Sequence, residues 1–431
     1  MTDPLPVPAA PALPDRHVTI DAVRGVAVMG ILLMNVVAMG MPEAAYMNPR
    51  AYGGAEGLDL GVYLVNFVLF DGKMRGLFSF LFGASMLLVI ERAEAKGESR
   101  ARVHYARMVV LLAFGLAHLW LIWWGDIINH YALIGMIAFF FRRARVRTLI
   151  VVGLVFVLVE LLIVGMFTAG VGFVEAGASR PGAAPQLIAQ YREMQNSVGI
   201  PSPEFIRRDP DIHRGGWWAM VGALFPKLVW FPLATVFQVG AETLAYMLFG
   251  MAAYRTGLFT GAWERARYLR WMAIGFGIGI PSYCLMAWAL VAADFSMTAV
   301  VGLVIGASTI VRPLMILGWA CLLVLLLRRG GALTDRLAAA GRMAFTNYLM
   351  TSILVTGFFY GWGLGFYGEL GRAELYIVVL GMWALILLWS KPWLSHFRYG
   401  PFEWLWRTLA RGRPQAMAGG AINRPVASGT Q

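Results

Sequence analysis

Long apolar runs most limit how this chain can fold. One run is LIVVGLVFVLVELLIVGMFTAGVGF (149–173), and another extends from Thr298 to Leu327 with few charges. About 20 apolar residues in a helix span the roughly 30 Å hydrocarbon core of a bilayer, and both runs are long enough. Of the 431 residues, 59% are hydrophobic and only 14% are charged, against about 25% charged in a soluble domain. We therefore expect an all-α, polytopic transmembrane helical bundle.

Basic loops between the apolar segments set the expected topology. ERAEAKGESRARVHYAR (91–107) and FRRARVR (141–147) are strongly basic, and such loops stay in the cytoplasm. Placing them there gives ten crossings with both termini cytoplasmic. The predicted spans are about 24–41, 74–91, 103–124, 126–141, 148–170, 236–257, 271–292, 299–327, 343–366 and 373–390.

This topology divides the chain into five parts. They are a disordered cytoplasmic tail (1–17), an N-terminal transmembrane half (18–170), an outer-side loop with an interfacial helix (171–235), a C-terminal transmembrane half (236–410) and a second disordered cytoplasmic tail (411–431). Segments 58–71 and 215–233 are expected to be interfacial or partly inserted helices on the outer side. Segment 171–214 is expected to be either a lid or a plain loop.

Several function classes find no support in the motifs. Cys284 and Cys321 lie inside apolar runs and form neither a metal-ligand spacing nor a disulfide framework. No P-loop, nucleophile elbow or dinucleotide fingerprint stands in a suitable context. The net charge of +12 is carried by short loops between spans, as membrane insertion requires. We expect no metal, no permanently bound cofactor and no nucleic-acid partner.

The first span carries a stripe of polar residues. Asp21 and Arg24 are three residues apart and can share a helix face. Asn35 lies about 20° off the same stripe at 100° per residue. Ionisable residues within a span indicate function by default, although they also hold helices together. The stripe is therefore either a binding surface or an interhelical ion pair with a packing asparagine.

The motif DGKMR (71–75) places cations at the outer start of the second span. Positive charge there runs against the inside-positive bias. We expect Lys73 and Arg75 to hold an anionic headgroup or an anionic substrate. The alternative is that both side chains reach lipid phosphates at the interface.

The stretch HLWLIWWGDIINHY (118–131) sets polar residues among tryptophans. Gly125 and Asp126 predict an outward turn in which Asp126 caps the next helix. A regular preceding helix would place His118 about 12 Å below Asp126. We expect His118 to be a general base or proton shuttle, or a core histidine bonded to a carbonyl. The tryptophans predict an interfacial aromatic belt: Trp120, Trp123 and Trp124.

Another polar face lies in FQVGAETLAYMLFG (237–250). Gln238, Glu242 and Tyr246 follow one another at four-residue intervals. A carboxylate in an apolar span requires a partner or a cavity, and Arg312 in STIVRPLMILGW is the expected partner. The alternative is that Glu242 and Arg312 share a ligand. A last polar step, near the inner end of a span, consists of Asn347 and Tyr348.

Five segments together resemble the YeiB-like family of multi-pass bacterial inner-membrane proteins, which carry the domain of unknown function 418. They are RGVAVMGILLMNVVAMGMPEAAYMNP, KMRGLFSFLFGAS, GLAHLWLIWWGDIINHYALIG, GRMAFTNYLMTS and GPFEWLWR. The resemblance covers about 16–410, with the motifs in the family's order.

That family is similar in its first helices to membrane acetyltransferases of the heparan-α-glucosaminide N-acetyltransferase type. Their DxxRG motif corresponds to Asp21, Arg24 and Gly25, and their first-helix asparagine to Asn35. In those enzymes a histidine shortly after that asparagine serves catalysis. This chain has no histidine between Asn35 and His104, so His118 is the residue expected to take the role.

The resulting hypothesis is a transmembrane acyltransferase. Cytoplasmic acyl-CoA is the expected donor, and a small molecule, lipid or glycan on the outer side the acceptor. The expected catalytic residues are His118, Asp126 and Asn35, with His118 as general base and Asn35 polarising the acyl carbonyl. The expected substrate-binding residues are Asp21, Arg24, Lys73, Arg75, Gln238, Glu242, Arg312, Asn347 and Tyr348. The alternative is a non-enzymatic transporter or lipid- or solute-binding protein that uses the same polar column. The sequence does not decide the oligomeric state, and both a monomer and a homodimer are compatible with it.

Overall fold

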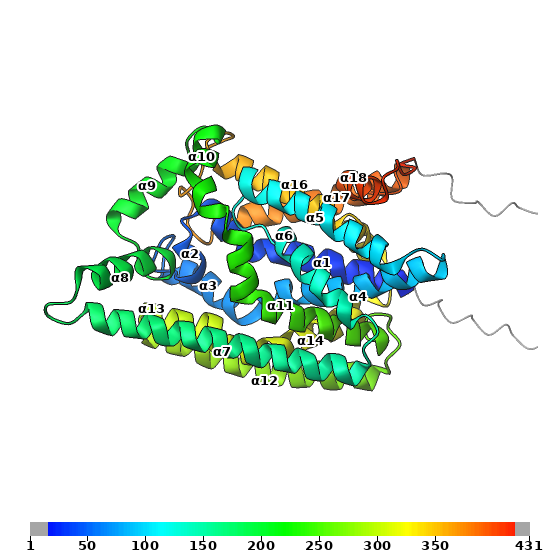
Figure 1. Ribbon diagram of the computed structural model, residues 1–431, viewed down its shortest axis with the longest axis horizontal. Helices are drawn as coiled ribbons and strands as arrows, with labels where there is room; N and C mark the ends of the chain where they lie inside the picture. The colour runs from blue at the N-terminus through cyan, green and yellow to red at the C-terminus, as the bar shows by residue number, and fades with distance from the viewer. Residues whose placement is uncertain (1–15, 419–431) are drawn as a thin grey trace, which may run out of the picture.

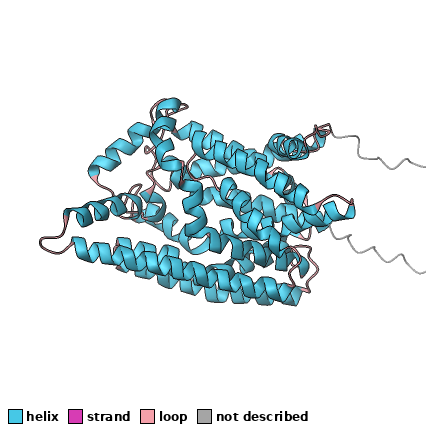
Figure 2. Cartoon of the chain, in the orientation of Figure 1, coloured by secondary structure: helices cyan, strands magenta, loops and turns pink. Residues whose placement is uncertain are grey.

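The computed structural model describes residues 16–418, and all regular elements in that range are helical (Figure 1, Figure 2). Within those residues the extended backbone pairs only in one isolated bridge, between Phe397 and Ala418. The elements are α1 (Arg16–Gly40), α2 (Ala44–Met47), α3 (Gly57–Leu69), α4 (Lys73–Ala95), α5 (Arg100–Leu121), α6 (Ile128–Ala138), η1 (Phe139–Phe141), α7 (Val146–Ala178), α8 (Pro185–Val198), α9 (Pro203–His213), α10 (Trp217–Leu228), α11 (Phe231–Arg255), α12 (Arg265–Ala292), α13 (Met297–Ala299), η2 (Val300–Ala307), α14 (Ser308–Leu327), α15 (Ala332–Arg342), α16 (Ala344–Phe359), α17 (Leu375–His396) and α18 (Pro401–Arg411).

The helices form a bundle with eight membrane-crossing candidates among the described residues, and two shorter apolar segments lie between them. Eight segments are long and apolar enough to cross a membrane, and two shorter apolar helical segments are Ile128–Phe141 and Ala344–Phe359. These ten segments follow the ten predicted spans in order, so the all-α transmembrane bundle is confirmed. The start of α1 and helix α18 lie at the same end of the bundle (Figure 1), as an even number of crossings requires.

Residues 171–235, which were predicted to form a loop and one interfacial helix, contain more helix than expected. Helix α7 has 33 residues, about 50 Å, and continues to Ala178 instead of ending near residue 170. Most of the segment expected to be a lid or loop then forms α8 and α9; α8 turns back beside the final part of α7, and α9 leads to α10 at the same end of the bundle (Figure 1). The sequence signal for these helices is weak because their apolar residues are few.

A break in the helix precedes the second predicted span, which α4 covers without interruption. Residues Gly57–Ala95 form one candidate span by length and composition, but the helix breaks into α3 and α4. Gly72, between them, has a left-handed backbone with φ of 68°, which glycine adopts without steric cost. As expected, α3 is a separate helix. It packs against α12 and buries Tyr63 and Phe67.

Helices α1 and α15 approach each other very closely. A Cβ atom on Gly341 would stand 1.8 Å from the backbone oxygen of Asp21, and one on Gly25 would stand 2.1 Å from the oxygen of Leu337. Real Cβ atoms cannot approach that closely, so both positions require glycine. The contact explains the glycine of the DxxRG motif by backbone packing.

The alanine substitution Gly341→Ala should force α1 and α15 apart and lower the free energy of unfolding by about 1–3 kcal/mol. Thermal unfolding of the purified protein in detergent measures the change. The matched control is Gly381→Ala in α17, where an added Cβ meets no atom within 4 Å. Equal midpoints for the two variants would contradict the close packing.

Candidate functional site

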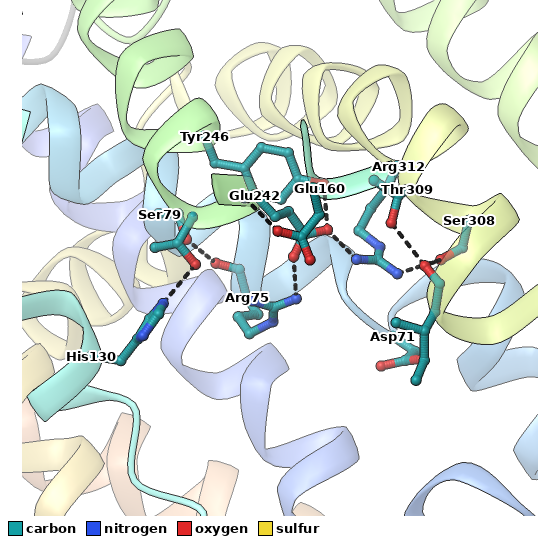
Figure 3. Close-up of polar contacts among 12 residues, drawn as sticks. Asp71, Arg75, Ser79, His130, Glu160, Glu242, Tyr246, Ser308, Thr309 and Arg312 are labelled. Atoms are coloured by element: carbon teal, nitrogen blue, oxygen red, sulfur yellow. Dashed lines mark hydrogen bonds and ion pairs between the residues drawn. The ribbon is translucent and has the colours of Figure 1, made fainter. Parts of the chain in front are cut away.

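A buried carboxylate, Glu242 of α11, binds two arginines from two other helices (Figure 3). Nη2 of Arg75, in the first turn of α4, donates to Oε2 of Glu242 at 2.6 Å. Nη1 of Arg312, in α14, donates to Oε1. The Glu242 side chain is 1% exposed and Arg312 is 7% exposed, whereas Arg75 is 26% exposed. The cluster is therefore closed around the carboxylate and open on the side of Arg75.

Two further side chains complete the surroundings of Glu242. The hydroxyl of Tyr246, one helical turn along α11, donates to Oε1 at 2.8 Å. The carboxylate of Glu160, on α7, accepts the backbone N–H of Glu242 at 3.1 Å. Glu160, Glu242 and Arg312 stand about 21, 20 and 22 Å along their helices from the ends at the basic loops. The cluster thus lies at membrane depth.

The local backbone explains how Arg312 reaches this position. The π-helix η2 precedes α14, and π-helical turns are frequent at functional sites. Nη2 of Arg312 donates to the carbonyl of Val304 in η2 at 3.3 Å and to the hydroxyl of Ser308. A Cβ on Gly72 would lie 2.6 Å from Nε of Arg312. The break before α4 therefore leaves room for this guanidinium.

A second polar group joins His118 to Asp126. Helix α5 ends at Leu121, and the following turn brings Asp126 back, so that Nδ1 of His118 lies 2.8 Å from Oδ1 of Asp126. The expected 12 Å separation is wrong because the helix does not continue to the turn. Oδ2 of Asp126 accepts both the backbone and side-chain N–H of Asn129 at 2.8 Å, so Asp126 holds the first turn of α6 from the position before its N-cap residue, Ile127. Nε2 of His118 is buried and has no protein partner among the described residues.

The start of α6 connects the two polar groups. Asn129 bonds Asp126, and Nε2 of His130 lies 3.0 Å from the hydroxyl of Thr243, the neighbour of Glu242. The hydroxyl of Tyr131 donates to the backbone oxygen of Arg75 at 3.1 Å. Three consecutive residues thus link the His118–Asp126 pair to the Glu242 cluster.

Two predicted residues lie beside the His118–Asp126 pair. The Tyr348 ring centroid is 5.6 Å from that of His118, and its hydroxyl accepts the backbone N–H of Ile127 at 3.3 Å. Asn35 is one turn before Ala38, whose backbone oxygen accepts the indole N–H of Trp123 at 3.4 Å. Asn35 is half-buried, and no described residue forms a hydrogen bond with its side chain. Its amide is therefore free to bind another molecule.

The polar stripe at the other end of α1 is engaged within the fold. Nη1 of Arg24 donates to Asp21 at 2.7 Å, as the spacing predicts, and Nη2 donates to Ser85 of α4 at 2.7 Å. Nη1 also lies 3.4 Å from the backbone oxygen of Gly341. Arg24 therefore joins three helices, far along α1 from Asn35.

Besides Asp21 and Arg24, three more of the predicted binding residues lie outside both polar groups. Lys73 is fully buried, with its ammonium bonded to the backbone oxygen of Phe67 and 3.2 Å from the Tyr283 ring centroid, so it does not face a lipid headgroup. Gln238 is exposed on the surface of α11. Asn347 is buried, and its amide donates to Ala340 and Ser390.

The expected tryptophan belt is wrong for Trp123. This side chain is buried and packs near His118, because the chain reverses at the end of α5 and carries it inward. The indole of Trp120 donates to the backbone oxygen of Leu228 at 3.2 Å, which ties α10 to α5.

Three residues of the site were not predicted from the sequence. Glu160 is the only charged residue in the apolar run 149–173. A single carboxylate in such a run indicates a buried polar site and could have identified it. Ser308 and Thr243 had no signal, since small hydroxyl residues are common in spans. Among residues 16–418, no three His, Cys, Asp or Glu side chains converge as a metal site requires.

The fold and site define a class of protein: a polytopic helical membrane bundle that holds charged side chains at membrane depth. Residues 253–413 match a family model described as "Protein of unknown function (DUF418)". The chain is 31% identical over 409 residues to "Uncharacterized protein YeiB" of Escherichia coli (strain K12), covering 92% of this chain and 96% of that protein. It is 31% identical over 412 residues to "Uncharacterized protein YxaH" of Bacillus subtilis (strain 168), covering 91% and 94%. The chain belongs to the DUF418 family of YeiB-like proteins. No solved structure matches it.

Replacing the buried carboxylate by Glu242→Gln leaves Arg75 and Arg312 without a counter-charge and should cost about 3–5 kcal/mol of stability. Thermal unfolding in detergent measures the loss. Asp335→Asn, which removes the exposed 3.0 Å pair with Lys391, is the control and should cost at most about 1 kcal/mol. A Glu242 variant as stable as this control would show that the cluster does not hold α4, α11 and α14 together.

Proposed function

We propose that this chain is a transmembrane acyltransferase of the bacterial inner membrane, with both termini in the cytoplasm. It transfers an acyl group from cytoplasmic acyl-CoA to a hydroxyl or amine acceptor on the outer side. The observation that carries the proposal is the pair of His118 and Asp126, in which Nε2 of His118 is buried and unpartnered.

The chemistry follows from which nitrogen of His118 is occupied. A carboxylate only accepts hydrogen bonds, so Nδ1 carries the proton toward Asp126 and Nε2 keeps its lone pair. Nε2 takes the proton of the acceptor as the acceptor attacks the thioester carbonyl carbon. The tetrahedral intermediate then collapses, the carbon–sulfur bond breaks, and the CoA sulfur leaves with the proton held by His118.

Asn35 is the group that supports the developing oxyanion. Its side chain is half-buried and unpaired among the described residues. It lies one turn before Ala38, whose backbone oxygen accepts the indole N–H of Trp123. A side-chain amide can donate to an oxyanion, and removing one such donor costs about 100-fold or more in rate.

The acyl donor approaches from the end that carries the basic loops. Arg24 lies toward that end of α1 with its side chain 20% exposed, and residues 141–147 and the start of α12 (265–270) add positive charge. Such charge attracts the phosphates of CoA. The bonds of Arg24 to Asp21 and Ser85 fix it as a positioning residue for α1 as well.

His118→Gln should lower the rate of acyl transfer by about 100-fold or more, because glutamine cannot act as a base. The assay is transfer from labelled acyl-CoA by the purified protein. The control, His104→Gln, lies on the same helix and keeps a donor for the backbone oxygen of Gly135, now 3.0 Å from its Nε2. Full transfer by His118→Gln would remove the base from the mechanism. Absence of transfer with every acyl-CoA would instead favour the translocation of a solute along the same polar column.

Asp126→Asn should also lower the rate by about 100-fold or more while leaving the fold intact. The new amide oxygen still accepts from Asn129, but the amide nitrogen faces Nδ1 and shifts the His118 proton to Nε2. Rates and thermal unfolding midpoints are measured on the same preparation. A normal rate with an unchanged midpoint would contradict the orienting role of Asp126.

A further inference from the structure

The break between α3 and α4 places a helix N-terminus next to two arginines. Gly72 forms the N-cap of the 23-residue helix α4, and no side chain caps its first turn, although the backbone oxygen of Phe70 accepts the N–H groups of Lys73 and Met74. Interrupted helices within a membrane bundle commonly direct such N-terminal ends at anionic groups. The π-helix η2 interrupts the neighbouring segment immediately before α14, so two irregular helices meet here.

Arg75 offers hydrogen-bond donors that the protein does not use. Only Nη2 has a partner within residues 16–418, namely Glu242. Nε and Nη1 are unpaired without being fully buried, and the side chain is 26% exposed. Since a guanidinium has five N–H groups in a planar fork, a carboxylate or phosphate can bind its free edge through two parallel hydrogen bonds.

Arg312 adds a second unpaired donor from the opposite side. Its side chain is 7% exposed, yet Nε is buried without a partner among the described residues. This nitrogen lies next to Gly72 at the start of α4, where an added Cβ would be 2.6 Å from it. A buried, unsatisfied N–H of a charged group is costly, and an acceptor at the helix start would satisfy it.

The cluster also has more positive than negative charge at ion-pair distance. Arg75 and Arg312 share the single carboxylate of Glu242. Within the described residues, neither guanidinium forms an ion pair with Glu160, which instead accepts the Glu242 backbone N–H. Asp71 accepts the Tyr46 hydroxyl at 3.4 Å and likewise pairs with neither arginine. Burial raises the pKa of Tyr46, so that hydroxyl adds no negative charge.

We infer that the break before α4 is an anion-binding site for a ligand carrying a carboxylate or phosphate group. Arg75 contacts the anion with its free edge, and the α4 N-terminus and Arg312 provide further positive potential. This anion site does not depend on the proposed acyl transfer, since acyl-CoA takes no part in binding the anion. The anion is either free in solution or the phosphate of a lipid headgroup.

Binding is tested on the purified full-length chain in nanodiscs of phosphatidylcholine, which adds no net charge. Inorganic phosphate is titrated by calorimetry, and a parallel set of nanodiscs contains phosphatidic acid. Arg75→Gln should weaken phosphate binding by about tenfold or more, because charge-assisted bonds are lost. Arg214→Gln is the control, since this arginine also pairs with one glutamate, Glu369, and is partly exposed. Wild-type affinity in Arg75→Gln would overturn the inference.

A second measurement needs no variant and covers the case in which Arg75→Gln fails to fold. Phenylglyoxal modifies accessible guanidinium groups, and mass spectrometry quantifies the peptides that contain Arg75 and Arg214. The anion should protect Arg75 at least severalfold and leave Arg214 unaffected. Protection by phosphate identifies a free anion, and protection only by phosphatidic acid identifies a lipid headgroup. If neither protects Arg75, the site does not exist.

Discussion

The charge on Glu242 is the constraint on which the interior of this bundle depends. A lone ionised carboxylate in an apolar interior is very costly, and pairing offsets that cost only with several well-placed donors. Two arginines and the hydroxyl of Tyr246 supply them. Arg75 and Arg312 reach Glu242 from two other helices, and both lie close to a departure from regular helix: the break at Gly72 and the π-helix before Ser308.

The His118–Asp126 pair is built differently, and the contrast suits different tasks. Around Glu242, the carboxylate oxygens are occupied and Arg75 keeps free donors, an arrangement for holding an anion. At His118, one nitrogen is fixed by a carboxylate and the other is left as a free base. Residues 129–131, at the start of α6, bond to both groups. A shift of this helix start would therefore move side chains in both groups.

Contacts within one helix were predictable from the sequence, and most contacts between helices were not. The Asp21–Arg24 and Glu242–Tyr246 pairs follow from helical spacing, and the Glu242–Arg312 pair from the need of a buried carboxylate for a cation. The second ion pair, between Arg75 and Glu242, depends on how α4 packs against α11, and no local sequence pattern predicts that packing. Lys73 was predicted to hold an anionic headgroup or substrate, because the sequence separates 58–71 from the span 74–91 but does not show that the Lys73 side chain packs inward against Phe67 and Tyr283. The contact of His118 with Asp126 depends on where α5 ends, and helix ends are poorly marked in a run of apolar residues.

The protonation of His118 is the most direct test of this mechanism. Nitrogen-15 NMR of protein labelled at histidine distinguishes a ring nitrogen that carries a proton from one that does not, and His118→Gln identifies the signals of His118. We predict a proton on Nδ1, which faces Asp126, and none on Nε2. A proton on Nε2, with Nδ1 free, would contradict the assignment of His118 as the base.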